Sequence, residues 1–178
     1  LLVPIGTYFS ATHYANFSEF IFYLIAYVFM NIGAFAVLMI IEQAEGHTEG
    51  KGYAGLYYRA PLTAVAMVLL ILSLAGIPLS GGFFGKLYII MGTMQTQQYW
   101  LGALMIATSV VSFYYYFSIV RQMFMRSDYE PAAIKVSVPL GITVWLCALI
   151  SVALGVVPHL VLKMIESVFT LTKDFIIM

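Results

Sequence analysis

Long apolar stretches alternate with short polar ones along this chain. A helix needs about 20 apolar residues to cross the hydrocarbon core of a bilayer, so these stretches are read as membrane spans. The predicted spans cover about 19–41, 61–77, 80–95, 99–121 and 136–158, with residues 1–6 as the tail of a preceding span. Glycine and proline interrupt the long region 61–95. The pattern predicts an all-α, polytopic transmembrane helix bundle with a discontinuous helix near 76–86.

The chain begins Leu-Leu-Val-Pro, with neither an initiator Met nor a charged leader. We therefore expect residues 1–178 to form a single transmembrane domain that is a fragment of a longer subunit. Ser18 is the predicted N-cap of the first full span, and Pro61 and Pro139 suit the first turns of later ones. If 61–77 and 80–95 cross the membrane separately, the positive charges divide almost evenly between its two sides, and orientation stays open.

Composition supports the membrane class and excludes others. The chain is 62% hydrophobic and 9% charged, with a mean hydropathy of +0.96, which far exceeds the needs of a soluble domain. Its net charge is zero, so it lacks the basic surface of a nucleic-acid-binding protein. The single cysteine, Cys147, excludes an intrachain disulfide, and three dispersed histidines give no metal-binding spacing. We expect no catalytic residue, metal or cofactor on this chain.

Lys86 is the first candidate for function, because it stands alone in an uncharged stretch that runs from 60 to 120. A charge at bilayer depth costs at least about 2.5 kcal/mol and usually marks an ion pathway. Just before it lie the residues of the predicted helix break, namely Gly76, Pro78, Gly81 and Gly82. Interrupted helices often line ion sites in transporters. The alternative is a tight connection beside a lysine that only reaches the membrane surface.

Two polar stripes point to a hydrated path near this base. Tyr23, Tyr27 and Asn31 share one face of the first span by the helical period. A second stripe on the span 99–121 comprises Gly102, Ser109, Ser112 and Tyr116. Together with Lys86, the predicted proton pathway comprises Asn31, Ser109, Ser112 and Tyr116. Small and hydroxyl residues also serve close helix packing in membranes, so packing remains an alternative for both stripes.

Several motifs carry a family resemblance that covers nearly the whole chain. The main ones are Arg59-Ala60-Pro61-Leu62, Leu72-Ser73-Leu74-Ala75-Gly76-Ile77-Pro78 and Gly82-Phe83-Phe84-Gly85-Lys86-Leu87-Tyr88. Further pieces agree in order and spacing: Tyr27-Val28-Phe29-Met30-Asn31-Ile32-Gly33-Ala34-Phe35, Ser109-Val110-Val111-Ser112-Phe113-Tyr114-Tyr115-Tyr116 and Leu154-Gly155-Val156-Val157-Pro158. The sequence resembles the antiporter-like membrane subunits of respiratory complex I and of multisubunit sodium/proton antiporters. Within that group it is most similar to the subunit N family of bacterial NADH-quinone oxidoreductase, the counterpart of mitochondrial subunit 2.

The resemblance implies a C-terminal part of a subunit of about fourteen spans, in which a discontinuous span bears a central basic residue. That role falls on Lys86. The resemblance further implies proton translocation coupled to electron transfer from NADH to quinone, with NADH, FMN, iron–sulfur clusters and quinone on other subunits. The implied partners are the other membrane subunits of complex I, the missing N-terminal half of the same subunit and the lipid bilayer. The implied location is the bacterial inner (plasma) membrane.

Two other functions remain open on the sequence. One is a subunit of a sodium/proton antiporter complex, which has no redox enzyme attached. The other is a structural membrane scaffold in which Lys86 is only an anchor. Neighbouring genes would distinguish the antiporter from complex I, since dehydrogenase and quinone-binding subunits favour complex I and cation-antiporter subunits favour the antiporter. The scaffold predicts that an apolar substitution of Lys86 leaves transport intact and alters only assembly.

Overall fold

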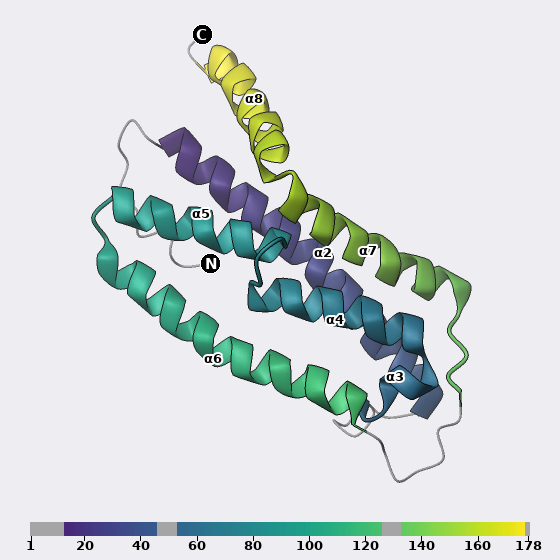
Figure 1. Ribbon diagram of the computed structural model, residues 1–178. Coiled ribbons are helices and arrows are strands. Elements are labelled where there is room, and N and C mark those ends of the chain that lie inside the picture. Colours follow the sequence, from purple (N-terminus) through teal and green to yellow (C-terminus); the bar gives the residue numbers. More distant parts are fainter. Residues whose placement is uncertain (1–12, 46–52, 126–132, 177–178) are drawn as a thin grey trace.

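The computed structural model describes residues 13–45, 53–125 and 133–176, with side chains described for 18–44, 53–125 and 133–168 (Figure 1). The predicted tail of a preceding span at 1–6 lies outside these residues. The described part of the chain is helical and contains no strand. Its helices are α2 (His13–Glu45), α3 (Leu56–Arg59), α4 (Pro61–Ala75), α5 (Gly81–Gln95), α6 (Tyr99–Phe124), α7 (Val138–Val156) and α8 (Pro158–Ile176). The predicted all-α helix bundle is confirmed.

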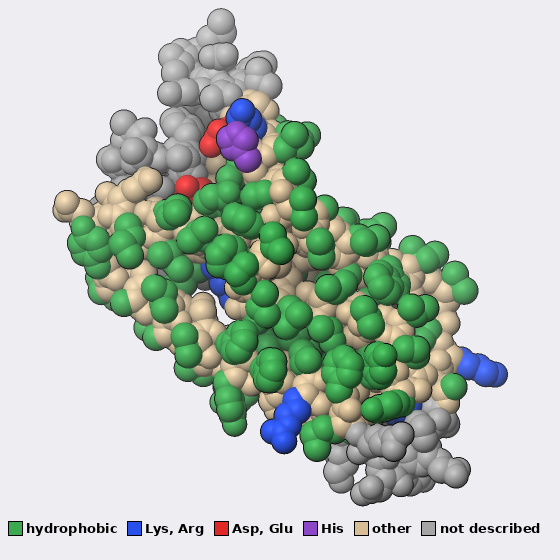
Figure 2. All heavy atoms as spheres, in the orientation of Figure 1, with side chains coloured by type: hydrophobic (Ala, Val, Ile, Leu, Met, Phe, Trp, Pro, Cys, Tyr) green, Lys and Arg blue, Asp and Glu red, His purple; other side chains and the backbone are tan. Residues whose placement is uncertain are grey.

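Among the described residues, three helices are long and apolar enough to cross a membrane: Ser18–Ala44 within α2, all of α6 and all of α7. Large apolar side chains also face outward along them, and Val110, Tyr114 and Ile142 are each more than 60% exposed. Figure 2 shows hydrophobic side chains over most of the visible face. Exposed apolar surface of this extent is characteristic of a protein that contacts lipid or other membrane helices. The chain is a multi-pass membrane protein.

Helices α4 and α5 follow one another along the bundle (Figure 1), and they correspond to the two spans that the sequence predicts over 61–77 and 80–95. Each has 15 residues, and at 1.5 Å per residue each extends about 22 Å, less than the bilayer core of about 30 Å. The longer helices α2, α6 and α7 each contact both of them. The pair therefore extends along the bundle, with the break between its two helices.

Two loop regions lie at the same end of the bundle. The backbone N–H of Gly55 donates to the carbonyl of Gln122 (3.2 Å), and that of Ile134 donates to the carbonyl of Arg59 (3.2 Å). These bonds connect the corner before α4 with the end of α6 and with the segment that leads into α7. Helix α8 leaves the other end of α7 and lies against α2 (Figure 1).

Close helix packing holds α2, α4 and α7 together. A Cβ atom added at Gly33 of α2 would lie 2.7 Å from Leu70 Cδ1 and 2.8 Å from Cys147 Cβ. Leu70 is fully buried and Cys147 nearly so. Small residues at such crossings let membrane helices approach closely, which maximises dispersion contacts. This crossing makes the frame that positions the break.

Several helix boundaries can be compared with the sequence predictions. Pro61 begins α4, and Pro139 lies in the first turn of α7, as predicted. The predicted N-cap at Ser18 is wrong, because α2 starts at His13 and Ser18 lies inside the helix. The sequence reading ended its last span at 158 and assigned no element after it, whereas α8 begins at Pro158. This helix carries Lys163, Glu166, Lys173 and Asp174 among its apolar residues, which is why its sequence does not have the long apolar run of a span.

Candidate functional site

The break begins with a regular helix stop at the end of α4. Gly76 has a φ of 88°, in the left-handed region that glycine adopts without steric cost. Its N–H donates to the carbonyl of Ser73 (3.0 Å), and the N–H of Ile77 donates to that of Leu72 (3.0 Å). This pair of bonds is a Schellman motif. It satisfies two of the four carbonyls that every helix leaves without an intrahelical donor.

The other two carbonyls are occupied by Lys86. Its Nζ donates to the carbonyl of Leu74 (2.8 Å) and to that of Ala75 (3.3 Å), although it comes from the second turn of α5. Within the described residues, the hydrogen bonds of this amine go to these carbonyls and to no side chain. A cation at a helix C-terminus interacts favourably with the helix dipole. Lys86 therefore caps the C-terminus of α4 from across the break.

The remaining residues of the break turn the chain into α5. Leu79 has a φ of 74°, which is rare and costly for a residue with a side chain. Ser80 is the N-cap of α5: its hydroxyl accepts from the N–H of Phe83 (3.3 Å) and donates to the carbonyl of Ile77 (2.6 Å). Pro78, which lies between Ile77 and Leu79, has no backbone N–H that would need a hydrogen-bond partner. The link is thus built from specific caps on both sides.

A buried pair of serines ties the break to α7. Ser151 Oγ donates to Ser73 Oγ (2.6 Å), and Ser73 Oγ accepts in turn from the N–H of Gly82 (3.3 Å). Both serines are about 1% exposed. A buried hydroxyl requires a partner, so this chain of bonds fixes α4, α5 and α7 relative to one another. Sequence reasoning missed this pair, although two serines deep inside apolar spans were a visible signal.

Gly81 and Gly82 belong to the first turn of α5, although the sequence assigns them to the break. A Cβ at Gly82 would collide with the backbone carbonyl of Ser73, and one at Gly81 would lie 2.9 Å from Leu154 Cβ. Gly76 and Pro78 do lie in the break itself. The two later glycines therefore allow close backbone approach at the start of α5.

Some residues of the predicted polar stripes bond within their own helix or serve close packing, whereas the tyrosines come together. Asn31 Nδ2 donates to the carbonyl of Tyr27 (2.7 Å), and Ser112 Oγ donates to that of Thr108 (2.9 Å), so both bond to their own helices. Ser109 is half-buried. Gly102 is buried where α6 meets α5, and a Cβ there would lie 2.9 Å from Thr93 Oγ1.

The tyrosines of the two stripes come together near Lys86. The rings of Tyr23 and Tyr27 lie 5.8 Å apart, and Tyr116 of α6 lies near both phenols. Tyr23 also lies against Gly85, the neighbour of Lys86: a Cβ there would be 2.9 Å from its ring. The structure therefore assembles Tyr23, Tyr27 and Tyr116 into a group of phenols, here called the tyrosine group, which lies beside the turn that carries the lysine.

Glu19 is a second ionisable residue that the sequence reading passed over. It is half-buried at the start of the apolar part of α2. It interacts electrostatically with Glu166 of α8 and with Tyr88 of α5, two residues after Lys86. The sequence does contain a signal for Glu19, because an acidic residue next to an apolar run is unusual. Ionisable groups within membrane spans are usually functional. Among the described residues no set of three or more metal-ligating side chains occurs.

Two short helices joined by a capped break and packed among three longer apolar helices define a multi-pass membrane protein. The family described as "NADH:quinone oxidoreductase/Mrp antiporter, TM" matches residues 4–112. The chain belongs to this family. The expected resemblance is thereby confirmed.

The particular relatives are subunits of NADH-quinone oxidoreductase. Subunit N from Paenibacillus sp. (strain JDR-2) is 51% identical over 178 residues, which is 99% of this chain and 34% of the relative. Subunit N from Brevibacillus brevis is 46% identical over 89% of this chain and 31% of the relative. The chain thus spans about a third of the length of these relatives.

Solved structures show the same fold. The chain is similar to a chain of respiratory complex I from Thermus thermophilus, with a TM-score of 0.70 and 27% identity over 85% of this chain and 35% of that one. It is also similar to a chain of the Mrp complex from Dietzia sp. DQ12-45-1b, with a TM-score of 0.76 over 86% of this chain and 37% of that one. At 20% identity the second likeness supports the fold alone.

Proposed function

We propose that this chain is part of a proton-translocating membrane subunit of NADH-quinone oxidoreductase, and that Lys86 is its proton-exchanging group. The observation that carries the proposal is the bonding of the Lys86 amine to the last two carbonyls of α4. Its support is the family membership and the subunit N relatives. The redox groups, namely NADH, FMN, iron–sulfur clusters and quinone, would lie on other subunits, in a bacterial inner (plasma) membrane.

Two features of its position have opposite effects on the protonation of the Lys86 amine. Burial away from water disfavours the charged form of a lysine, whereas the end of α4 favours it. No carboxylate among the described residues forms an ion pair with the amine. A modest change in the surrounding electric field is then enough to shift its protonation. Quinone reduction elsewhere would supply this change through charged groups in the N-terminal half of the subunit.

The tyrosine group offers a route for the proton beside Lys86. Phenol hydroxyls donate and accept hydrogen bonds, so with intervening water they can transfer protons along a chain. Glu19, which interacts with Tyr88 on the same helix as Lys86, would exchange protons toward the end of the bundle where α8 lies. Asn31 and Ser112 bond to their own helices and contribute less to this route.

We infer the orientation by treating α4 and α5 as one broken span. Arg59, Arg121 and Lys135 lie at one end, and the sequences of the adjoining loops add Lys51 and Arg126, whereas Lys163 and Lys173 lie on α8. Cytoplasmic loops carry an excess of Lys and Arg. The end with α3 would therefore face the cytoplasm. Labelling single cysteines in sealed vesicles tests this: Lys135→Cys should react from the cytoplasmic side only and Lys163→Cys from the other, and the reverse pattern would contradict the assignment.

The function is tested in vesicles that contain the whole complex, by measuring protons pumped per NADH oxidised. Lys86→Met should assemble and pump markedly fewer protons. Lys86→Arg retains a positive charge at the helix end and should lose less. Unchanged pumping by Lys86→Met would refute the role of this lysine, and a scaffold predicts that outcome.

The second candidate function is a subunit of a sodium/proton antiporter. The observation that favours it is the description of the matching family, which names Mrp antiporters beside NADH:quinone oxidoreductase. Sequence identity to subunit N favours the first function. Purification of the native assembly separates the two, since complex I would carry NADH dehydrogenase activity and an antiporter would not.

A further inference from the structure

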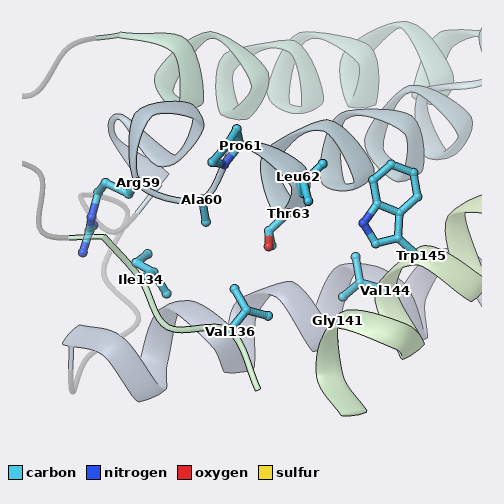
Figure 3. A pocket seen from close by; sticks show the side chains of 10 residues that line it. All are labelled: Arg59, Ala60, Pro61, Leu62, Thr63, Ile134, Val136, Gly141, Val144 and Trp145. Carbon is cyan, nitrogen blue, oxygen red and sulfur yellow. The ribbon is translucent and has the colours of Figure 1, made fainter. Parts of the chain in front are cut away.

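A cavity of about 360 Å³ lies at the end of the bundle that carries Arg59, far along α4 from the helix break. Its walls come from the corner between α3 and α4, from the extended segment 133–137 and from the first turns of α7 (Figure 3). Ligand pockets in proteins occupy roughly 300–1,000 Å³, so this one is large enough for part of an organic molecule. It takes no part in the proton route described above.

The inside of the cavity is almost wholly apolar. Ile134, Val136 and Val144 line it, together with Leu62 and the ring of Trp145. Gly141 contributes open space, because a Cβ there would make only an ordinary contact of 3.6 Å with Val136. Such walls suit a hydrocarbon chain and offer little to a sugar or a nucleotide.

Polar groups occur at one side of the cavity. Arg59 lies at its edge, beside the extended segment (Figure 3). Thr63 is only 6% exposed, and Figure 3 shows its hydroxyl oxygen directed into the space. None of the hydrogen bonds described for this part of the chain involves that hydroxyl. The N-terminus of α4, which starts at Pro61, adds the positive end of a helix dipole.

We propose that this cavity binds an anionic phospholipid, with its phosphate at Arg59 and part of one acyl chain against Ile134, Val136 and Val144. The cavity lies where α4 and α7 begin, at the level where the chain enters the membrane, so a lipid headgroup and its chain meet matching surfaces. The guanidinium of Arg59 has five N–H donors and can bind a phosphate while it retains another contact. Basic pockets between membrane helices on the cytoplasmic side are known lipid headgroup sites.

The test uses the intact complex in phosphatidylcholine vesicles that contain a trace of phosphatidylglycerol with a photoreactive group on its acyl chain. Cross-linked peptides from 59–63 and 133–145 should be found by mass spectrometry. Unlabelled phosphatidylglycerol should compete for the site, whereas extra phosphatidylcholine and inorganic phosphate should not. Competition by phosphate alone would mean that the acyl chain is not recognised, and equal competition by phosphatidylcholine would mean that charge is not recognised. Either result overturns the proposal.

Matched variants connect the cross-link to the cavity. Gly141→Phe fills the cavity from α7 and should abolish the labelling. Ile142→Phe adds bulk to the outward face of the same helix and should leave the labelling unchanged. Arg59→Gln should lower the preference for phosphatidylglycerol over phosphatidylcholine by about fivefold.

Three outcomes would refute the lipid site. The first is lipid cross-linking that persists in Gly141→Phe. The second is evidence from the cross-links that a protein segment or a neighbouring subunit, and not the lipid, fills the cavity in the assembled complex. The third applies if Gly141→Phe prevents assembly. In that case, an assembled Arg59→Gln complex with an unchanged preference for phosphatidylglycerol would refute the site.

Discussion

The helix break and the polar stripe of α6 contain similar residues but use them differently. At the break, Lys86, Ser73 and Ser151 form hydrogen bonds that connect different helices. On α6, Thr108 and Ser112 donate to carbonyls of their own helix. Polar residues that bridge helices fix a unique arrangement, whereas those that bond within a helix fix little beyond that helix. The comparison supports the proposal that the functional centre lies at the break.

The largest effect is expected from Gly82→Ala, because its new methyl group would collide with the carbonyl of Ser73. Overpacking against backbone costs about 3 kcal/mol or more. The variant should therefore reduce assembly of the complex, measured on native gels. Gly141→Ala is the matched control, since its methyl group meets only Val136 at an ordinary contact distance. Normal assembly and stability of Gly82→Ala would show that the backbones are less close than described.

Ser73→Ala should have the next largest effect. It removes the acceptor for Gly82 and Ser151 and leaves both donors buried, at a cost of about 1–3 kcal/mol. The midpoint of thermal inactivation of the complex should fall. Adding Ser151→Ala should cost less than the sum of the two single changes, because the donor and the acceptor are then removed together. Strict additivity would argue against the bond between these serines.

Glu19→Gln should act on pumping rather than on assembly. The amide is nearly isosteric with the carboxyl group but cannot exchange a proton at neutral pH. We expect fewer protons per NADH, with a smaller loss than in Lys86→Met. Glu166→Gln, which changes the exposed partner on α8, should leave the ratio unchanged. Equal losses in the two variants would indicate a general charge effect and remove Glu19 from the proton route.

Ser112→Ala should have the smallest effect. Its hydroxyl bonds only to the carbonyl of Thr108, which belongs to the same helix. We expect stability within about 0.5 kcal/mol of the parent, unchanged assembly and an unchanged pumping ratio. A clear loss of pumping would return the Ser112 hydroxyl to the proton route and weaken the contrast with the break.

The sequence predicted the features that depend on local composition. Apolar run length located α2, α6 and α7, and Gly76 with Pro78 located the end of α4. It could not show how α4 and α5 lie relative to each other, because this depends on how α2, α6 and α7 pack against both helices. The sequence also could not identify the partners of Lys86. They are backbone carbonyls, which every residue has, so no residue type marks their position. Contacts between Glu19, Tyr88 and Glu166 required three helices to be placed.

The most direct test of the account is chemical rescue of the amine at position 86. Lys86→Cys in the full complex should lose pumping, and alkylation with 2-bromoethylamine, confirmed by mass spectrometry, restores an amine of nearly the same length. Iodoacetamide gives a neutral adduct of similar size as the control. We predict that the aminoethyl adduct recovers protons pumped per NADH and that the neutral adduct does not. Complete aminoethylation with no recovery, or equal recovery with both adducts, would contradict the claim that a protonatable amine at the helix break drives translocation.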